Sequence, residues 1–163
     1  MPKTLAEQLG PDTIVRFERA APLRIEEGDV LVAKCRLTAI YLYGYAVEML
    51  LKYGYFKNIG FGVIDEIDRD ARNRAMAVAR TNSLMSWDPH DIPGWARLLV
   101  WDKQVLHTPG YPAGLARKIV ERSLLVYENW RPQMRYRNTE PSPKSVSSVR
   151  DVAKWFLDNY GRF

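Results

Sequence analysis

The apolar residues between positions 30 and 51 recur at alternating intervals of three and four. They are Val30, Ala33, Leu37, Ile40, Gly44, Val47 and Leu51. Residues at this spacing share one face of an α-helix, and an apolar face is buried against other elements. Asp29 is a suitable N-cap, so the pattern predicts a helix over residues 29–54. Gly44 costs about 1 kcal/mol relative to alanine inside a helix, which indicates a close helix crossing.

A second series of residues runs beside the apolar face of this helix. It comprises Lys34, Thr38, Tyr41, Tyr45, Glu48 and Lys52. Two interpretations remain open. The series lines a cleft that holds a ligand, or its aromatic rings complete the core while Glu48 and Lys52 pair at the surface as i, i+4 neighbours.

Further helices follow from the same periodicity and from capping residues. We expect them at about residues 63–82, 91–107, 112–130 and 145–160, with a basic, proline-containing loop at residues 131–144. His90 and Asp91 are adjacent, which favours helix capping over a catalytic pair. The sequence therefore predicts an all-α fold, an up-and-down bundle of four to five helices.

The N-terminal residues carry turn and helix-breaking signals. Gly10-Pro11-Asp12 is typical of a turn, and Pro22 interrupts any helix. We therefore predict that residues 1–27 form an N-terminal extension and residues 28–163 form the helical bundle. The extension packs on its own body or reaches a partner chain.

Length and composition favour a single domain of 163 residues. Cys35 is the one cysteine, so the chain forms no internal disulfide, which suits a reducing cytosol. No apolar run reaches the ~18 residues of a membrane span, and the N-terminus lacks the apolar core of a signal peptide. We expect a cytoplasmic protein without a membrane partner. The two histidines and one cysteine predict neither a metal site nor a cofactor.

The net charge of +5 is concentrated in the last third of the chain. Residues 111–163 hold 10 Lys/Arg and 5 Asp/Glu, whereas residues 1–110 hold 14 of each kind. A basic surface attracts phosphate, which points to nucleic acid or nucleotide. The alternative is a solvated basic helix without a ligand.

Three segments together resemble the HEPN family of helical domains. The run from Ala39 to Lys52 resembles the first core helix, which shows a small-aromatic-Gly-Tyr-x-x-Glu-x-x-Leu-Lys pattern in several prokaryotic branches. His90-Asp91-Ile92 resembles the His-Asp-Leu that opens a later helix. Trp130-x4-Arg135-Tyr136 resembles the Trp…Arg-Tyr segment before the last helix. The three segments follow the family's order and span about residues 28–160.

The resemblance implies a bundle of four or five helices and a homodimer. Family members occur in toxin–antitoxin pairs, in RNA-cutting defence systems and beside nucleotidyltransferases. Many are ribonucleases, which use an Arg-x(4–6)-His motif near the last helix, composed across the dimer.

This chain lacks that motif. Its histidines are His90 and His107, and none follows Arg131 or Arg135. Cleavage needs a group that transfers a proton near neutral pH, and arginine remains protonated there. We therefore expect no ribonuclease activity of the family type.

The remaining candidates form a ligand-binding set from the long helix and the basic loop: Tyr41, Tyr45, Glu48, Lys52, Arg131, Arg135, Tyr136 and Arg137. Arginines bind phosphate bidentately and a tyrosine ring stacks on a base. In the competing interpretation, Arg135 pairs with Glu48 and Tyr136 packs on the helix tyrosines.

The sequence thus predicts a non-catalytic, HEPN-like protein that binds RNA or nucleotide phosphate through its basic C-terminal loop and helix face, within a toxin–antitoxin or defence system. The first alternative is a protein–protein subunit, for example a partner of a nucleotidyltransferase. The second is a ribonuclease with a non-standard site around Arg135, Tyr136, Glu48 and His90.

Overall fold

The computed structural model describes residues 11–107, 110–136 and 138–163. Over these residues the chain forms helices and no strand, apart from one isolated bridge between Thr13 and Glu66. This confirms the all-α fold class. The α-helices are α2 (Ile14–Leu31), α3 (Arg36–Asn58), α4 (Arg69–Thr81), α5 (Ile92–Trp101), α6 (Ala113–Asn129) and α7 (Pro143–Asn159). Three short helices follow α5, α6 and α7: η1 (Asp102–His107), η2 (Pro132–Tyr136) and η3 (Tyr160–Arg162).

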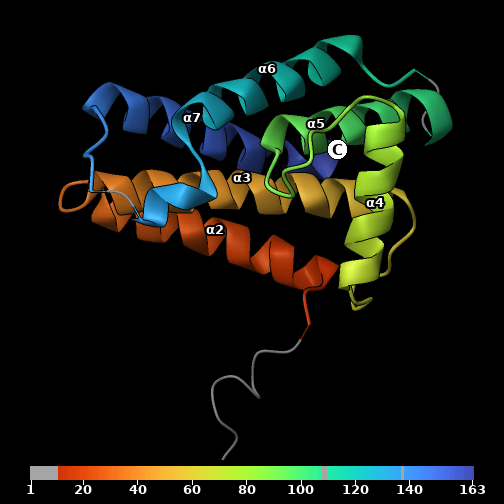
Figure 1. Ribbon diagram of the computed structural model, residues 1–163, viewed down its shortest axis with the longest axis horizontal. Helices are drawn as coiled ribbons and strands as arrows, with labels where there is room; N and C mark the ends of the chain where they lie inside the picture. Colours follow the sequence, from red (N-terminus) through yellow and green to blue (C-terminus); the bar gives the residue numbers. More distant parts are fainter. Residues whose placement is uncertain (1–10, 108–109, 137) are drawn as a thin grey trace, which may run out of the picture.

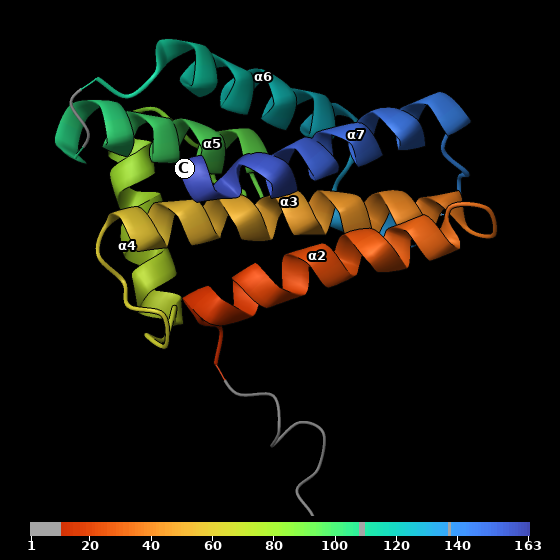
Figure 2. The ribbon, with the colours of Figure 1, turned by 180° about the vertical axis from the view of Figure 1, so that it is seen from behind.

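Helix α3 is the central element, and α2, α5, α6 and α7 all contact it. Figure 1 shows α2 along one side of α3, α5 and α7 along the other, and α6 outermost beyond them. Figure 2 shows the same layers from behind. Helix α4 runs across one end of the bundle instead of along it.

The central position of α3 follows from its composition, because the helix is apolar on nearly all sides after Ala39. The predicted apolar face is buried at Ile40, Gly44, Val47 and Leu51. Its first two members differ: Val30 is 74% exposed and Ala33 is also exposed. The chain turns between α2 and α3, so the prediction of one helix over residues 29–54 is wrong at its beginning.

The prediction of an N-terminal extension over residues 1–27 is wrong for residues 14–27, which belong to α2 and pack on α3. Residues 1–10 lie outside the described part of the chain. The buried face of α2 consists of Ile14, Phe17, Ala21, Ile25 and Gly28. Pro22 lies inside the helix, where a proline costs about 3 kcal/mol. Each large apolar side chain contributes about 1.5–3 kcal/mol when it is buried, so Ile14, Phe17 and Ile25 together outweigh that cost.

Asp29, predicted as an N-cap, instead joins three helices from the last turn of α2. Its carboxylate accepts hydrogen bonds from Tyr43 (2.8 Å) and from Arg150 Nε (2.7 Å), and Lys154 Nζ lies 2.9 Å away. The hydrogen bond from Arg150 contributes most to holding the pKa of Asp29 far below its ordinary value. The contact fixes α2 and α3 against α7.

The close approach predicted at Gly44 is made by an indole ring. A Cβ atom at position 44 would lie 2.3 Å from ring atoms of Trp130, the residue that follows α6. Trp130 Nε1 donates to the carbonyl oxygen of Tyr41 at 2.9 Å. Gly44 therefore makes room for a tryptophan that attaches the end of α6 to α3. Within the described residues, no helix has the length and apolar character to cross a bilayer.

Candidate functional site: a groove along helix α3

The second residue series of α3 lines three adjoining pockets, which we call the α3 groove. The first pocket, of about 330 Å³, lies between Cys35, Thr38 and Tyr41 of the helix region and Met134 and Arg135 of η2. The second, of about 310 Å³, lies between α2 and α3 and shares Tyr41 with the first. Its lining residues are Asp12, Arg16, Phe17, Ala20, Arg24, Tyr41, Leu42, Tyr45 and Met49.

The third pocket, of about 280 Å³, shares Tyr45 with the second and extends the groove toward α4 and α5. Its lining residues are Asp12, Phe17, Tyr45, Glu48, Met49, Lys52, Arg72, Pro89 and His90. Five of the six residues in the series that the sequence left open as cleft or core therefore line pockets, and Glu48 and Lys52 also form the i, i+4 pair of the other interpretation.

Two parallel aromatic rings form the centre of the groove. Tyr41 and Tyr45 are one helical turn apart, and their rings stack at a centroid distance of 6.2 Å and an angle of 8°. Tyr45 is 39% exposed. Burial raises the pKa of Tyr45, with Glu48 adding to the effect, so its hydroxyl stays protonated at neutral pH. Both rings line the second pocket.

Arginines of α2 face this aromatic pair. Arg16 and Arg24 line the same pocket as the two tyrosines. Arg24 also pairs with Glu27 at 2.8 Å, and both side chains are more than a third exposed. An exposed ion pair of this kind contributes about 1 kcal/mol or less, so an anionic ligand can compete with Glu27 for Arg24.

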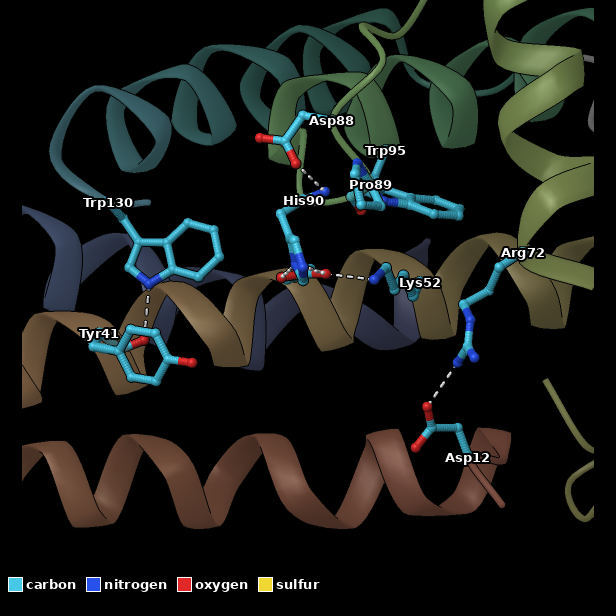
Figure 3. A network of polar contacts seen from close by, with 10 residues as sticks. Asp12, Tyr41, Lys52, Arg72, Asp88, Pro89, His90, Trp95 and Trp130 are labelled. Carbon is cyan, nitrogen blue, oxygen red and sulfur yellow. Dashed lines mark hydrogen bonds and ion pairs between the residues drawn. The ribbon is translucent and has the colours of Figure 1, made fainter. Parts of the chain in front are cut away.

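A buried carboxylate stands at the third pocket. The Glu48 side chain is 2% exposed, forms an ion pair with Lys52 and contacts the ring of His90. His90 Nδ1 lies 3.0 Å from Oε1 and 3.1 Å from Oε2 of Glu48. Figure 3 shows the His90 ring pointing toward α3, with Lys52 beside it. Burial alone would raise the pKa of Glu48, but Lys52 and His90 outweigh it, and the pKa is lowered. The carboxylate is therefore charged in the folded protein.

The charged Glu48 fixes the orientation of the His90 ring. A carboxylate only accepts hydrogen bonds, so Nδ1 carries the proton that it donates. The backbone N–H of His90 donates to Asp88 Oδ1 at 2.9 Å. The ring is 40% exposed and lines the pocket. Its second nitrogen, Nε2, has no hydrogen-bond partner among the residues that the structure describes.

Neighbouring contacts hold the loop that carries His90. Trp95 Nε1 donates to the carbonyl oxygen of Pro89 at 3.0 Å, and Lys52 Nζ lies 5.2 Å from the centroid of the Trp95 ring. Asp91 caps α5 by accepting from the N–H of Gly94 at 2.8 Å, which confirms the capping interpretation for Asp91. At the other wall, Arg72 of α4 pairs with Asp12 at 2.8 Å.

The basic loop contributes less to this groove than the sequence predicts. Arg135 lines the first pocket and lies over the ring of Tyr136, which is 76% exposed. The Arg131 guanidinium lies 3.4 Å from the centroid of the Tyr127 ring. Arg131 also lines a further pocket with Asp88, Gln133 and Met134, and this pocket shares Met134 with the first. The prediction for Arg137 lies outside the described residues.

The structure thus brings Tyr41, Tyr45, Glu48, Lys52 and Arg135 of the predicted set to one groove. It leaves Arg131 and Tyr136 off the groove lining. The competing interpretation of a Glu48–Arg135 ion pair is wrong, because Glu48 pairs with Lys52 and His90.

The predicted ligand-binding set lacks the groove residues contributed by other elements: Asp12, Arg16, Arg24, Arg72 and His90. Of these, His90 was named in the alternative of a non-standard ribonuclease site. His90 carried a signal in the His90-Asp91-Ile92 segment, but its contact with Glu48 joins positions far apart in the chain. Over the described residues, no group of three or more His, Cys, Asp and Glu side chains is placed to hold a metal ion.

No protein-family model, no curated protein and no solved structure matches the chain. The resemblance to HEPN domains therefore stays a prediction from the residues that carry it.

Proposed function

We propose that the α3 groove binds single-stranded RNA or a nucleotide, with bases against Tyr41 and Tyr45 and phosphates against the surrounding cations. The observation that carries this proposal is the parallel tyrosine pair facing Arg16 and Arg24 across one pocket. A base stacked on an aromatic side chain contributes about 1–3 kcal/mol without regard to sequence. The site differs from the sequence-based one, because α2 supplies arginines in place of most of the C-terminal loop.

The charge of the groove supports an anionic ligand. Its lining holds five cationic side chains and two carboxylates, which are Arg16, Arg24, Lys52, Arg72 and Arg135 against Asp12 and Glu48. Glu48 is buried behind Lys52 and His90, so the accessible charge is more positive than the count. Such a surface accumulates phosphate and releases counterions on binding, which makes affinity dependent on salt.

The length of the groove favours a short strand over a single nucleotide. From Thr38 to Lys52, α3 rises by about 21 Å at ~1.5 Å per residue. A stacked strand advances ~3.4 Å per nucleotide, so about six nucleotides span this distance.

The test is fluorescence anisotropy with a labelled uridine oligomer of about six nucleotides, without a terminal phosphate, at low and raised salt. We expect binding that weakens steeply with salt, and about a tenfold loss in Tyr45→Ala from the lost stacking. Tyr136→Ala is the matched variant, because it removes a more exposed tyrosine that the groove does not include. Absence of binding at low salt, or a larger loss in Tyr136→Ala, contradicts the proposal.

A gel of the same mixtures separates binding from cutting. We expect the oligomer to remain intact over a long incubation, since the chain lacks the family's catalytic motif. Cut RNA that becomes stable in His90→Asn would instead favour the non-standard ribonuclease. Assignment to a toxin–antitoxin or defence system, or to a nucleotidyltransferase partner, rests on the family resemblance alone.

A second candidate function is self-association through the outer face of α2. Leu23 and Val30 are 50% and 74% exposed there, and with Glu26 and Glu27 they line a shallow pocket. Arg19 and Glu27 lie four residues to either side of Leu23. An antiparallel two-fold packing of α2 on a second copy therefore sets Arg19 opposite the partner's Glu27 and Leu23 near the axis.

Light scattering on purified protein tests this second candidate. We expect a dimer for the wild type, a monomer for Arg19→Glu, and a restored dimer for the double variant Arg19→Glu, Glu27→Arg, because the swap re-creates opposite charges across the axis. A monomeric wild type, or a double variant that stays monomeric, overturns this packing.

A further inference from the structure

The net charge of the third pocket depends on the protonation state of one histidine, His90. The pocket brings together Lys52 and Arg72, with Asp12 and Glu48 as the carboxylates. These four formal charges cancel. His90, the remaining titratable side chain at its wall apart from Tyr45, therefore sets whether the pocket is neutral or carries one positive charge.

Glu48 leaves one ring nitrogen of His90 for this purpose. Both carboxylate oxygens are within hydrogen-bond distance of Nδ1. In the described part of the chain, Nδ1 is the His90 ring atom that has a hydrogen-bond partner, and Asp88 binds the backbone N–H. Neutral His90 thus presents the lone pair of Nε2 to the pocket, whereas protonated His90 presents an N–H donor.

We propose that this pocket is a phosphate subsite in which His90, Lys52 and Arg72 hold one phosphate of the ligand, and that it does so when His90 is protonated. The inference rests on the proposed function, since the phosphate belongs to the strand bound along the groove. Beyond the proposed function, the inference names the side chains that contact a phosphate at this end of the groove and the protonation state in which they do so.

The donors suit a phosphate group. The Arg72 guanidinium offers a planar fork, Lys52 has N–H groups beyond the one it gives to Glu48, and protonated His90 adds Nε2–H. The Arg72–Asp12 pair is exposed on both sides, at 35% and 53%, so a phosphate competes with Asp12 at low cost. Glu48 lies behind the cations, with its oxygens occupied by Lys52 and His90.

The sign of the pH dependence follows from the charged groups that face the ring. Glu48 and Lys52 come from α3, Asp12 from the segment before α2, Arg72 from α4 and Asp88 from the loop of His90 itself. A neutral ring sets a lone pair against phosphate oxygens, and an imidazolium donates to them. The protonated ring therefore binds phosphate more tightly than the neutral ring does, so acid favours binding.

The experiment uses the full chain and the same uridine oligomer, whose internal phosphodiesters keep one negative charge each over this range. Anisotropy is measured at about pH 6 and about pH 8. We expect about tenfold tighter binding by the wild type at the lower pH, the contribution of one charged hydrogen bond. His90→Asn keeps a donor where Nδ1 contacts Glu48 but has no Nε2, and we expect equal, weak binding at both values. His90→Gln, which is uncharged, should also lose the dependence.

Lys118→Gln is the matched control, because it removes an exposed cation of α6 outside the groove. We expect this variant to keep the wild-type ratio between the affinities at the two pH values, even if the loss of a positive charge weakens binding at both. A wild type without pH dependence, or a His90→Asn variant that keeps it, overturns the subsite.

A second readout separates this subsite from the groove as a whole. Inorganic sulfate, which stays divalent, is titrated while the His90 ring nitrogen signals are followed by NMR. A shift of the Nε2 signal on addition of sulfate at about pH 6, and none at about pH 8, supports the subsite. If the oligomer nevertheless fails to bind, the proposed function is contradicted and the subsite is not. Oligomer binding with an unchanged His90 signal removes the subsite and leaves the groove.

Discussion

His90 and Glu48 meet across the interior of the bundle, with Nδ1 of the histidine 3.0 Å from one oxygen of the carboxylate and 3.1 Å from the other. His90 lies in the loop just before α5, and Glu48 lies in the middle of α3. The Glu48 carboxylate is nearly inaccessible to water, so its charge depends on His90 and Lys52. This contact supports the fold and also orients the ring that lines the groove.

Removing the carboxylate is expected to destabilise the protein strongly. In Glu48→Ala, the Lys52 ammonium, with a side chain that is 12% exposed, loses its ion pair. Breaking a buried pair from one side costs about 3–5 kcal/mol, and urea unfolding measures it. Glu121→Ala is the control, because Glu121 pairs with Arg117 on the exposed face of α6, where such pairs contribute about 1 kcal/mol or less. Equal losses in the two variants would contradict the stated role of Glu48.

The sequence places His90 and Glu48 together in one alternative site, but sequence patterns do not predict the direct contact between them. Periodicity assigns residues to a face of one helix, and it correctly grouped Ile40, Val47 and Leu51 as buried and Tyr41, Tyr45 and Glu48 as a second stripe. Periodicity does not predict which loop packs against that second stripe. The resemblance to a family singled out both Glu48 and His90, but the pairing of the two required the fold.

The N-terminal part shows a different limit. Ile14, Phe17, Ala21, Ile25 and Gly28 follow helical spacing as clearly as the residues of α3. Pro22 within this run predicts an interruption, because an interior proline costs a helix about 3 kcal/mol. Packing against α3 overrides it. Arg16 and Arg24 of the groove were absent from the predicted set for the same reason, since they belong to the helix that was not predicted.

The carboxylates also set the response of stability to acid. The pKa values of Glu48 and Asp29 are both lowered in the folded state. Such groups contribute stability above their unfolded pKa values of about 4, and the contribution is lost as the pH falls toward the folded values, because the unfolded chain then takes up protons that the folded chain does not. We expect the free energy of unfolding to decrease steadily below about pH 4.

Asp29→Asn isolates one part of this acid response. The variant cannot ionise at position 29, so its unfolding free energy should fall less steeply between about pH 4 and pH 2 than that of the wild type. At neutral pH it should be the less stable protein, since Arg150 and Lys154 lose their anionic partner. Urea unfolding over a pH series gives both quantities. Parallel curves for the two proteins would show that Asp29 titrates alike in the folded and unfolded chains.

A glycine pair tests how closely Trp130 packs on α3. In Gly44→Ala, the new methyl group would lie 2.3 Å from the indole of a tryptophan that is 1% exposed and hydrogen-bonded to Tyr41. Alanine gains about 1 kcal/mol in helix propensity, but displacing a buried ring by overpacking costs about 1–3 kcal/mol or more. We therefore expect a lower melting temperature.

Gly114→Ala is the matched control, because a methyl group there meets open space at the beginning of α6. This variant should leave stability unchanged or raise it by up to about 1 kcal/mol. Calorimetry that ranks Gly44→Ala as stable as Gly114→Ala would mean that Trp130 moves away from α3 without loss, and that its contact with Tyr41 does not hold α6 in place.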